Sequence, residues 1–162
     1  MSGKTDPVPP GFHSVVAHLC VRGASDSIAF YRRAFGAEEL MRFPGPDGKS
    51  VMYAELRIGD SVVIVNDEMP MMQYWLSPPA LKGTTVGLVM YVLDADALFN
   101  KAVAAGATAS MPLMDMFWGD RYGKLRDPYG HEWVIATHLE DVPPDEMGRR
   151  AEAFFKQIGA GC

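Results

Sequence analysis

The sequence predicts an α+β fold made of two βαβββ modules followed by a C-terminal helix. The first observation is an internal repeat of about 70 residues, measured from an apolar segment ending at Val21 to one ending at Val92. The second is that each of these segments is followed by a polar turn, a helical stretch and three β-like segments. The third is that glycines stand at matching places in both copies, with Gly36 and Gly106 after the helices and Gly59 and Gly130 in the turns.

The helices are predicted over residues 25–35 and 94–105, because apolar residues recur there at helical spacing. Hydroxyl or acidic residues at the start of each stretch are N-cap candidates, and the glycine after each stretch suits a left-handed C-cap. The first set comprises Ile28, Tyr31 and Phe35 with Ser25 or Asp26 as the cap, and the second comprises Leu98, Ala102 and Ala105 with Asp94 or Asp96 as the cap.

Three strands are predicted after each helix, separated by turns rich in Gly, Pro and Asp. They span residues 38–43, 50–57 and 61–66 in the first copy, and 108–113, 121–126 and 132–138 in the second. The resulting division is a flexible N-terminal arm (1–12), a first module (13–68), an inter-module crossover (69–85), a second module (86–140), and a C-terminal helix and tail (141–162).

Composition excludes several classes of partner. Fifteen Lys and Arg against twenty Asp and Glu give a net charge of −5 and an isoelectric point near 5.3, which disfavours nucleic acid and anionic membranes. No apolar run reaches the ~18 residues of a transmembrane helix, and no export signal is recognised. Two cysteines, Cys20 and Cys162, do not suggest a disulfide framework. We therefore expect a cytoplasmic protein.

Several strings resemble the vicinal-oxygen-chelate superfamily, which includes glyoxalases, bleomycin-resistance proteins and extradiol dioxygenases. Within it they are most similar to the PhnB-like glyoxalase/bleomycin-resistance group. The strings are IAFYRRAFGA (28–37), GPDG (45–48), AELRIGD (54–60), FWGDRYG (117–123) and DPYGH (127–131). The resemblance covers roughly residues 13–140 and implies that the two modules form a curved mixed sheet around a concave pocket.

Enzymes of that superfamily hold a divalent metal with His, Gln or Glu side chains from the first and last strands of both modules. The corresponding positions here carry no metal ligand, being Val16, Val63, Gly87 and Val134. A shift of two residues would bring in His18, Glu132 and His138 and still leave the set incomplete. We therefore expect no cofactor, with a divalent metal at an irregular site as the alternative.

Strand alternation predicts which side chains face the concave side. By this parity, Val63 and Val65 are placed there with Tyr53 and Glu55. The candidate ligand-binding residues are His18, Tyr53, Glu55, Trp118, Arg121, Tyr122, Glu132 and His138.

Alternatives remain open for these candidates. His18 is either a hydrogen-bonded core imidazole or a functional group. Glu55 faces solvent, pairs with Lys124 or Arg57, or serves the pocket. The 117–123 loop either binds a ligand or only forms a turn.

Three functions fit these features. A binding protein for a small, partly aromatic organic molecule needs only an apolar, aromatic pocket, so we favour it. A metal-dependent lyase, isomerase or dioxygenase needs ligands that are missing, and a metal-free enzyme would rely on His18 and Glu55 or on His138. A homodimer is expected in each case, because sheet edges need cover.

Overall fold

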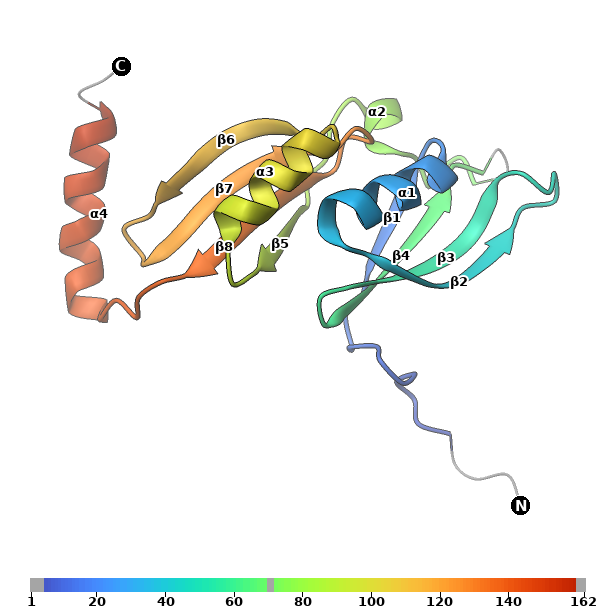
Figure 1. The fold of residues 1–162 in the computed structure, drawn as a ribbon, viewed down its shortest axis with the longest axis horizontal. Helices are drawn as coiled ribbons and strands as arrows, with labels where there is room; N and C mark the ends of the chain where they lie inside the picture. The colour runs from blue at the N-terminus through green and yellow to red at the C-terminus, as the bar shows by residue number, and fades with distance from the viewer. Residues whose placement is uncertain (1–4, 70–71, 160–162) are drawn as a thin grey trace. The chain divides into compact units, whose positions relative to one another are not determined.

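The computed structural model describes residues 5–69 and 72–159, so that Cys162 and the outermost parts of both predicted tails lie outside the described residues. The chain divides into two compact units. The first comprises the described residues up to Thr85 together with 128–130, and the second comprises 86–127 and the described residues from His131 onward. Each unit contains one four-stranded mixed sheet with one helix packed on it (Figure 1).

The first unit follows the order β1 (Ala17–Val21), α1 (Ala24–Phe35), β2 (Glu38–Pro44), β3 (Val51–Ile58) and β4 (Ser61–Asp67). Its strands lie in the order β1-β4-β3-β2, with β1 parallel to β4 and the other pairs antiparallel. Helix α1 covers one face and buries Ile28, Tyr31 and Phe35, the three residues whose spacing predicts the helix. The other face of the sheet, opposite α1, is called the first open face below.

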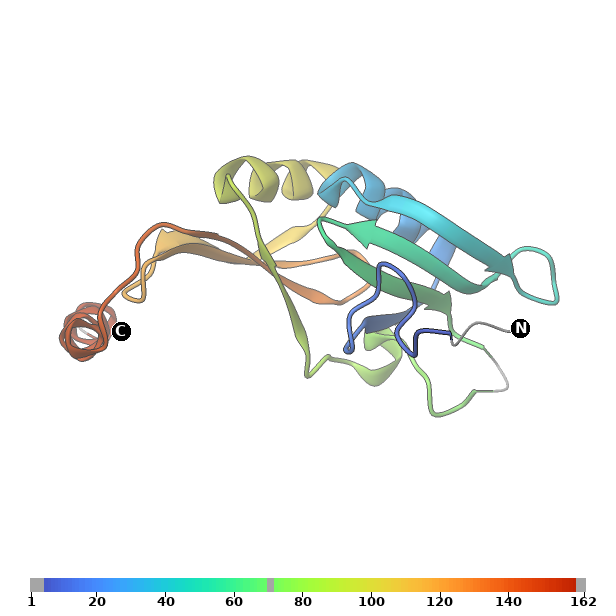
Figure 2. The same ribbon diagram turned by 90° about the horizontal axis from the view of Figure 1, so that it is seen from below.

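The second unit repeats this arrangement with β5 (Gly87–Tyr91), α3 (Ala95–Ala105), β6 (Thr108–Asp115), β7 (Asp120–Arg126) and β8 (Glu132–His138). The strand order is β5-β8-β7-β6. Helix α3 packs on one face of this sheet (Figure 2). Trp133 and Ile135 of β8 are buried on that side. The opposite side is the second open face. The two repeated units confirm the predicted α+β fold of βαβββ modules.

Helix ends follow the predicted glycines but not every predicted cap. Gly36 and Gly106 both adopt positive φ at the helix C-termini, as expected. Asp94 accepts a hydrogen bond from Ala97 N and caps α3. At α1 the predicted Ser25 or Asp26 cap is wrong, because Gly23 is the cap position and Asp67 Oδ1 accepts from the amides of Gly23 and Ala24. The capping carboxylate comes from the end of β4, too distant in sequence for a local motif to reveal.

Two further helices lie outside the sheets. Helix α2 (Pro78–Leu81) is a single turn in the crossover, and α4 (Pro144–Gly159) follows the last strand. Both figures show α4 beside the end of the β6–β7 hairpin rather than on a sheet face. None of the helices in the described part of the chain combines the length and apolar character needed to cross a membrane.

Candidate functional site

His18 lies on the first open face, near the start of β1. Its ring is 5.1 Å from the ring of Trp75 and 6.5 Å from that of Tyr53, measured between centroids. Burial lowers the pKa of His18, against an opposing hydrogen bond with the Asn66 side chain. The imidazole is therefore neutral at neutral pH and forms part of an aromatic cluster.

Tyr53 and Glu55 project from β3 on the same face. The Tyr53 hydroxyl donates to Glu55 Oε1 at 2.9 Å. Burial raises the pKa of Tyr53, and the hydrogen bond to the Glu55 carboxylate adds to this effect. Of the open alternatives for Glu55, pairing with Arg57 is wrong, because Arg57 pairs with Glu38 instead. Glu55 keeps a half-exposed carboxylate on the open face.

The crossover brings Trp75 to His18. The Trp75 indole donates to Asn66 Oδ1 at 3.0 Å, and its carbonyl accepts a weak hydrogen bond from the Cys20 thiol. Glu68 holds the same segment by accepting from the amide and hydroxyl of Ser77. Hydrogen bonds from Arg22 and then Ser77 lower the pKa of Glu68 to about 2, so the Glu68 carboxylate is ionised at neutral pH. Burial raises the pKa of Cys20 to about 11, which leaves a protonated, unreactive thiol.

The register of β4 corrects one prediction. Glu55 pairs with Ile64, and Ile64 pairs with His18 across the parallel ladder. Residues directly opposite in a sheet share a face, so Ile64 and Asn66 lie on the first open face. Val63 and Val65 instead lie on the α1 side, where they are buried. The expectation for these two valines is therefore wrong by one residue, which reverses every side chain of a strand.

Asp120 organises the second open face. Asp120 is only 3% exposed. Its carboxylate accepts hydrogen bonds from Tyr91 Oη and Trp118 Nε1, both at 2.9 Å, and from His138 Nδ1 at 2.7 Å. Burial opposes ionisation of Asp120, but the hydrogen bonds from His138, Tyr91 and Trp118 outweigh it and lower the pKa. Three side chains from three different segments thus converge on one carboxylate.

His138 is held by carboxylates on both sides. Its Nδ1 bonds Asp120 and its Nε2 bonds Asp141 Oδ1 at 3.0 Å. The hydrogen bond to Asp120, followed by that to Asp141, raises the pKa of His138. Both ring nitrogens donate, so the ring is stabilised as the imidazolium.

Aromatic rings surround this polar group. Trp118 and Tyr122 lie edge to face with centroids 5.4 Å apart. Tyr91 is 64% exposed, so its ring is available for contact although its hydroxyl is bonded. Trp118, Tyr122 and His138 are predicted site residues that the structure brings to one face.

Two other predicted residues of this unit do not join the group. Arg121, a candidate ligand-binding residue, lies instead on the α3 side of the sheet, where it pairs with Asp96 and Asp115. Successive residues of a strand face opposite sides, which separates it from Tyr122. Glu132 is on the open face and accepts from Arg126 and Ser110. Six residues separate Glu132 from His138 along β8, a distance of roughly 20 Å.

The donor set does not fit a divalent metal. Across residues 5–69 and 72–159, no group of three or more His, Cys, Asp and Glu side chains is arranged to hold an ion. Corrected for register, the β4 position is Ile64 rather than Val63, which is equally unable to act as a ligand. Glu132 and His138 are too far apart to share an ion. We derive no chemistry through a metal.

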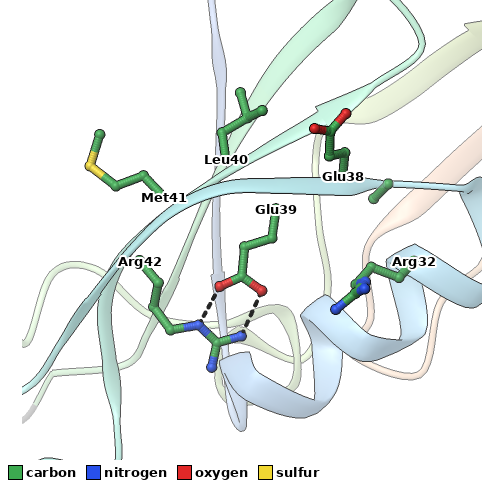
Figure 3. Close-up of a pocket in the computed structure, with 7 residues that line it drawn as sticks. Arg32, Glu38, Glu39, Leu40, Met41 and Arg42 are labelled. Carbon is green, nitrogen blue, oxygen red and sulfur yellow. Dashed lines mark hydrogen bonds and ion pairs between the residues drawn. The ribbon is translucent and has the colours of Figure 1, made fainter.

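A separate hollow of about 540 Å³ lies between α1 and β2 and is lined by residues 32 and 37–42 (Figure 3). Its charged groups are partly occupied with each other, since Arg42 makes two hydrogen bonds to Glu39. Arg42 also donates to Ser25 of α1. No predicted site residue lines this hollow.

Sequence reasoning missed several members of both groups. Asn66 is a polar residue directly after the apolar Val62–Val65 run, a signal that parity assigned to the wrong face. Trp75 follows Tyr74 in the crossover, where no periodic pattern marks either residue. Strand alternation places Asp120 and Tyr91 on the open face, but neither is among the candidate ligand-binding residues, and nothing local marks Asp141.

Known proteins share this architecture. A sequence model of the Glyoxalase/Bleomycin resistance protein/Dioxygenase superfamily matches residues 11–135. An uncharacterised protein of Mycobacterium bovis is 45% identical over 132 residues, covering 80% of this chain and 86% of its own length. Protein YjdN of Escherichia coli is 26% identical over 133 residues, covering 68% of this chain and 85% of YjdN.

Solved structures agree. TioX from Micromonospora sp. ML1 superposes with a TM-score of 0.62 at 29% identity, covering 78% of this chain and 99% of that one. A gene product from Arabidopsis thaliana superposes with a TM-score of 0.61 at 29% identity, covering 77% of this chain and 98% of the Arabidopsis chain. With its repeated βαβββ units and a matching model over most of its length, the chain belongs to the glyoxalase/bleomycin resistance protein/dioxygenase superfamily.

Proposed function

We propose that this protein binds a small, partly aromatic organic molecule without a metal at the superfamily's usual position. The observation that carries the proposal is the cluster of rings on the first open face. There a neutral His18 lies against Trp75 and Tyr53, beside the carboxylate of Glu55. Rings offer stacking surfaces, and a hydroxyl, an imidazole and a carboxylate offer both donors and acceptors.

The second open face supports the same chemistry. Tyr91, Trp118 and Tyr122 present ring surface next to the Asp120–His138 pair. Small-molecule sites typically combine apolar and aromatic walls with a few polar groups. A pocket shared by both modules and membership of the PhnB-like group remain predictions from the sequence.

The test is a binding screen. The full chain is titrated calorimetrically with a panel of naphthalenes and quinolines that carry a hydroxyl, amino or carboxyl group. We expect at least one member to bind, and Trp75→Ala to weaken the binding of any member that occupies the first open face. Tyr74→Ala is the matched control, because Tyr74 is an exposed neighbour with no ring contact to His18. No binding by any member of the panel would contradict the proposal.

A metal-free lyase or isomerase is the second candidate, and the lowered pKa of His18 favours it. A neutral imidazole can accept a proton at neutral pH, as a general base requires. The test is incorporation of deuterium from D₂O at the carbon next to the carbonyl group of naphthyl and quinolinyl methyl ketones, followed by NMR and compared with the rate in buffer alone. His18→Gln should abolish incorporation, and equal incorporation by this variant would exclude the role.

We also propose a homodimer. Large apolar side chains of the second unit are exposed at Val86, Leu93 and Leu139. Exposed apolar groups and open sheet edges commonly mark association surfaces. Light scattering coupled to gel filtration should give twice the chain mass at micromolar concentration, and a monomer would contradict this proposal.

A further inference from the structure

A row of aromatic rings leads from the second open face to α4. Tyr122 meets Trp118 at 5.4 Å, and Trp118 meets Phe117 edge to face at 4.9 Å. Phe117 in turn lies 5.4 Å from Phe154 and 5.9 Å from Phe155 of α4. All four spacings lie within the range at which aromatic pairs stabilise each other.

The backbone of the loop is fixed independently of these rings. The Gly119 carbonyl accepts from the amides of Leu139 and Glu140, and a Cβ at Gly119 would lie 2.1 Å from the Glu140 oxygen. The backbone conformation at Gly119 therefore does not depend on the α4 rings that contact Phe117. What remains adjustable is the packing of the Phe117 ring against Trp118, since side chains have several rotamers and the indole is otherwise held by its hydrogen bond to Asp120.

Helix α4 is attached at a second point. The Arg150 guanidinium forms two hydrogen bonds with the Glu140 carboxylate, both at 2.7 Å, and one with Glu146. Glu140 belongs to the segment that holds Gly119. The ion pair thus fixes α4 relative to the loop, while Phe154 supports the ring of Phe117. A helix of this length needs such tertiary contacts, because an isolated one is marginal in water.

The helix also lies beyond the part of the chain common to the superfamily. The match to the family model ends at residue 135 of this chain, and α4 begins at Pro144. The common fold supplies Trp118 and its bond to Asp120, whereas α4 supplies the ring behind Phe117.

We propose that α4 completes a binding site for a flat aromatic ligand on the second open face, with Phe154 as a positioning residue that acts on Trp118 through Phe117. This inference rests on the proposed function. The ligand would stack on Trp118 and Tyr122, and its polar substituent would meet His138 or Tyr91. Without Phe154, Phe117 would lose support on one side and Trp118 would sample other rotamers.

The experiment measures affinity and the state of Trp118 in parallel. The full chain is labelled with 5-fluorotryptophan, and the ¹⁹F signal of Trp118 is identified with Trp118→Phe. We expect Phe154→Ala to shift or broaden this signal, to leave those of Trp75 and Trp133 unchanged, and to weaken the best ligand of the naphthalene and quinoline panel about fivefold or more. Arg150→Met should act in the same direction, because it releases the Glu140 attachment.

Two controls separate positioning from general damage. Phe154→Tyr keeps the ring and should retain both the signal and the affinity. Glu152→Ala changes an exposed residue of the same helix that has no ring contact, and it should have no effect. If the wild-type protein binds the panel and Phe154→Ala binds it equally well, this inference is wrong and the proposed function stands. If the wild-type protein binds no panel member, the proposed function itself fails.

Discussion

The two open faces come from the same repeated unit, yet they hold their histidines in opposite states. On the first face His18 lies among Trp75 and Tyr53, and burial lowers its pKa. On the second face His138 bonds Asp120 and Asp141, and these bonds raise its pKa. The first face thus favours a neutral imidazole, and the second favours an imidazolium between two carboxylates.

This difference shows where a repeated fold is constrained and where it is free. Most helix-facing side chains of both sheets are apolar, because they form the cores of the units. The open faces carry no such requirement, so each can acquire its own partners. The two faces consequently offer different chemistry to a ligand on nearly the same backbone. Four predictions test this contrast.

The largest expected effect is on stability. Asp120→Ala leaves three hydrogen-bond donors without their shared acceptor and should lower the free energy of unfolding by about 3 kcal/mol. Glu55→Ala removes a half-exposed acceptor of one hydrogen bond and should cost about 1 kcal/mol or less. Urea denaturation of both variants measures the difference. Equal losses would show that the two carboxylates are equivalent and that Asp120 is no organising centre.

The next effect is on ligand affinity. Trp118→Ala should weaken binding of an aromatic panel compound by ~1–3 kcal/mol, the range of a lost aromatic anchor. Calorimetric titration of Trp118→Ala and Trp75→Ala shows which face the compound occupies. A compound whose affinity changes in neither variant would be bound elsewhere, and both open faces would lose their assigned role.

The contrast in pKa predicts opposite pH dependences. In the folded protein the pKa of His18 lies below its ordinary value. Its contribution to stability is therefore present above about pH 6.5 and is lost as the pH falls from there through the folded pKa. His138 holds its proton above the ordinary value, so its contribution is present at low pH and is lost as pH rises through the folded pKa. NMR titration of both imidazoles measures the two pKa values directly.

Variants isolate the two histidines. The stability difference between wild type and His18→Gln should rise with pH between 5 and 8, and that between wild type and His138→Gln should fall. Asp120→Asn should return the pKa of His138 toward its ordinary value and leave His18 unaffected. Two histidines titrating at the same pH would remove the distinction between the faces.

The smallest expected effect is that of metal removal. Dialysis against EDTA should leave panel binding and thermal stability unchanged, since neither face offers a set of three metal ligands among the described residues. Elemental analysis before and after dialysis provides the control. A stoichiometric metal whose removal abolishes binding would contradict the proposed function. It would favour a metal-dependent lyase, isomerase or dioxygenase instead.

Local patterns were sufficient to predict the elements of this protein. Apolar spacing in α1 and the glycines at Gly36 and Gly106 depend on contacts within a few residues, and the structure confirms them. The alternation in β8 was also sufficient to place Glu132 and His138 on the open face and Trp133 and Ile135 on the α3 side. In α3 the predicted Ala102 is buried, whereas Phe99 takes the buried position predicted for Leu98.

The tertiary structure decided whatever depended on partners distant in sequence. Val62–Val65 is apolar at every position, so only its pairing with β3 and β1 determines that Ile64 faces outward. The α1 cap, the Trp75 contact with His18 and the three donors on Asp120 each join segments that no local pattern connects. By itself the sequence therefore determined the two modules and most of the residues on their open faces, because periodicity and turns are local properties. Which of those residues touch, and hence which histidine is charged, was decided by folding, because hydrogen bonds and burial depend on distance in space rather than along the chain.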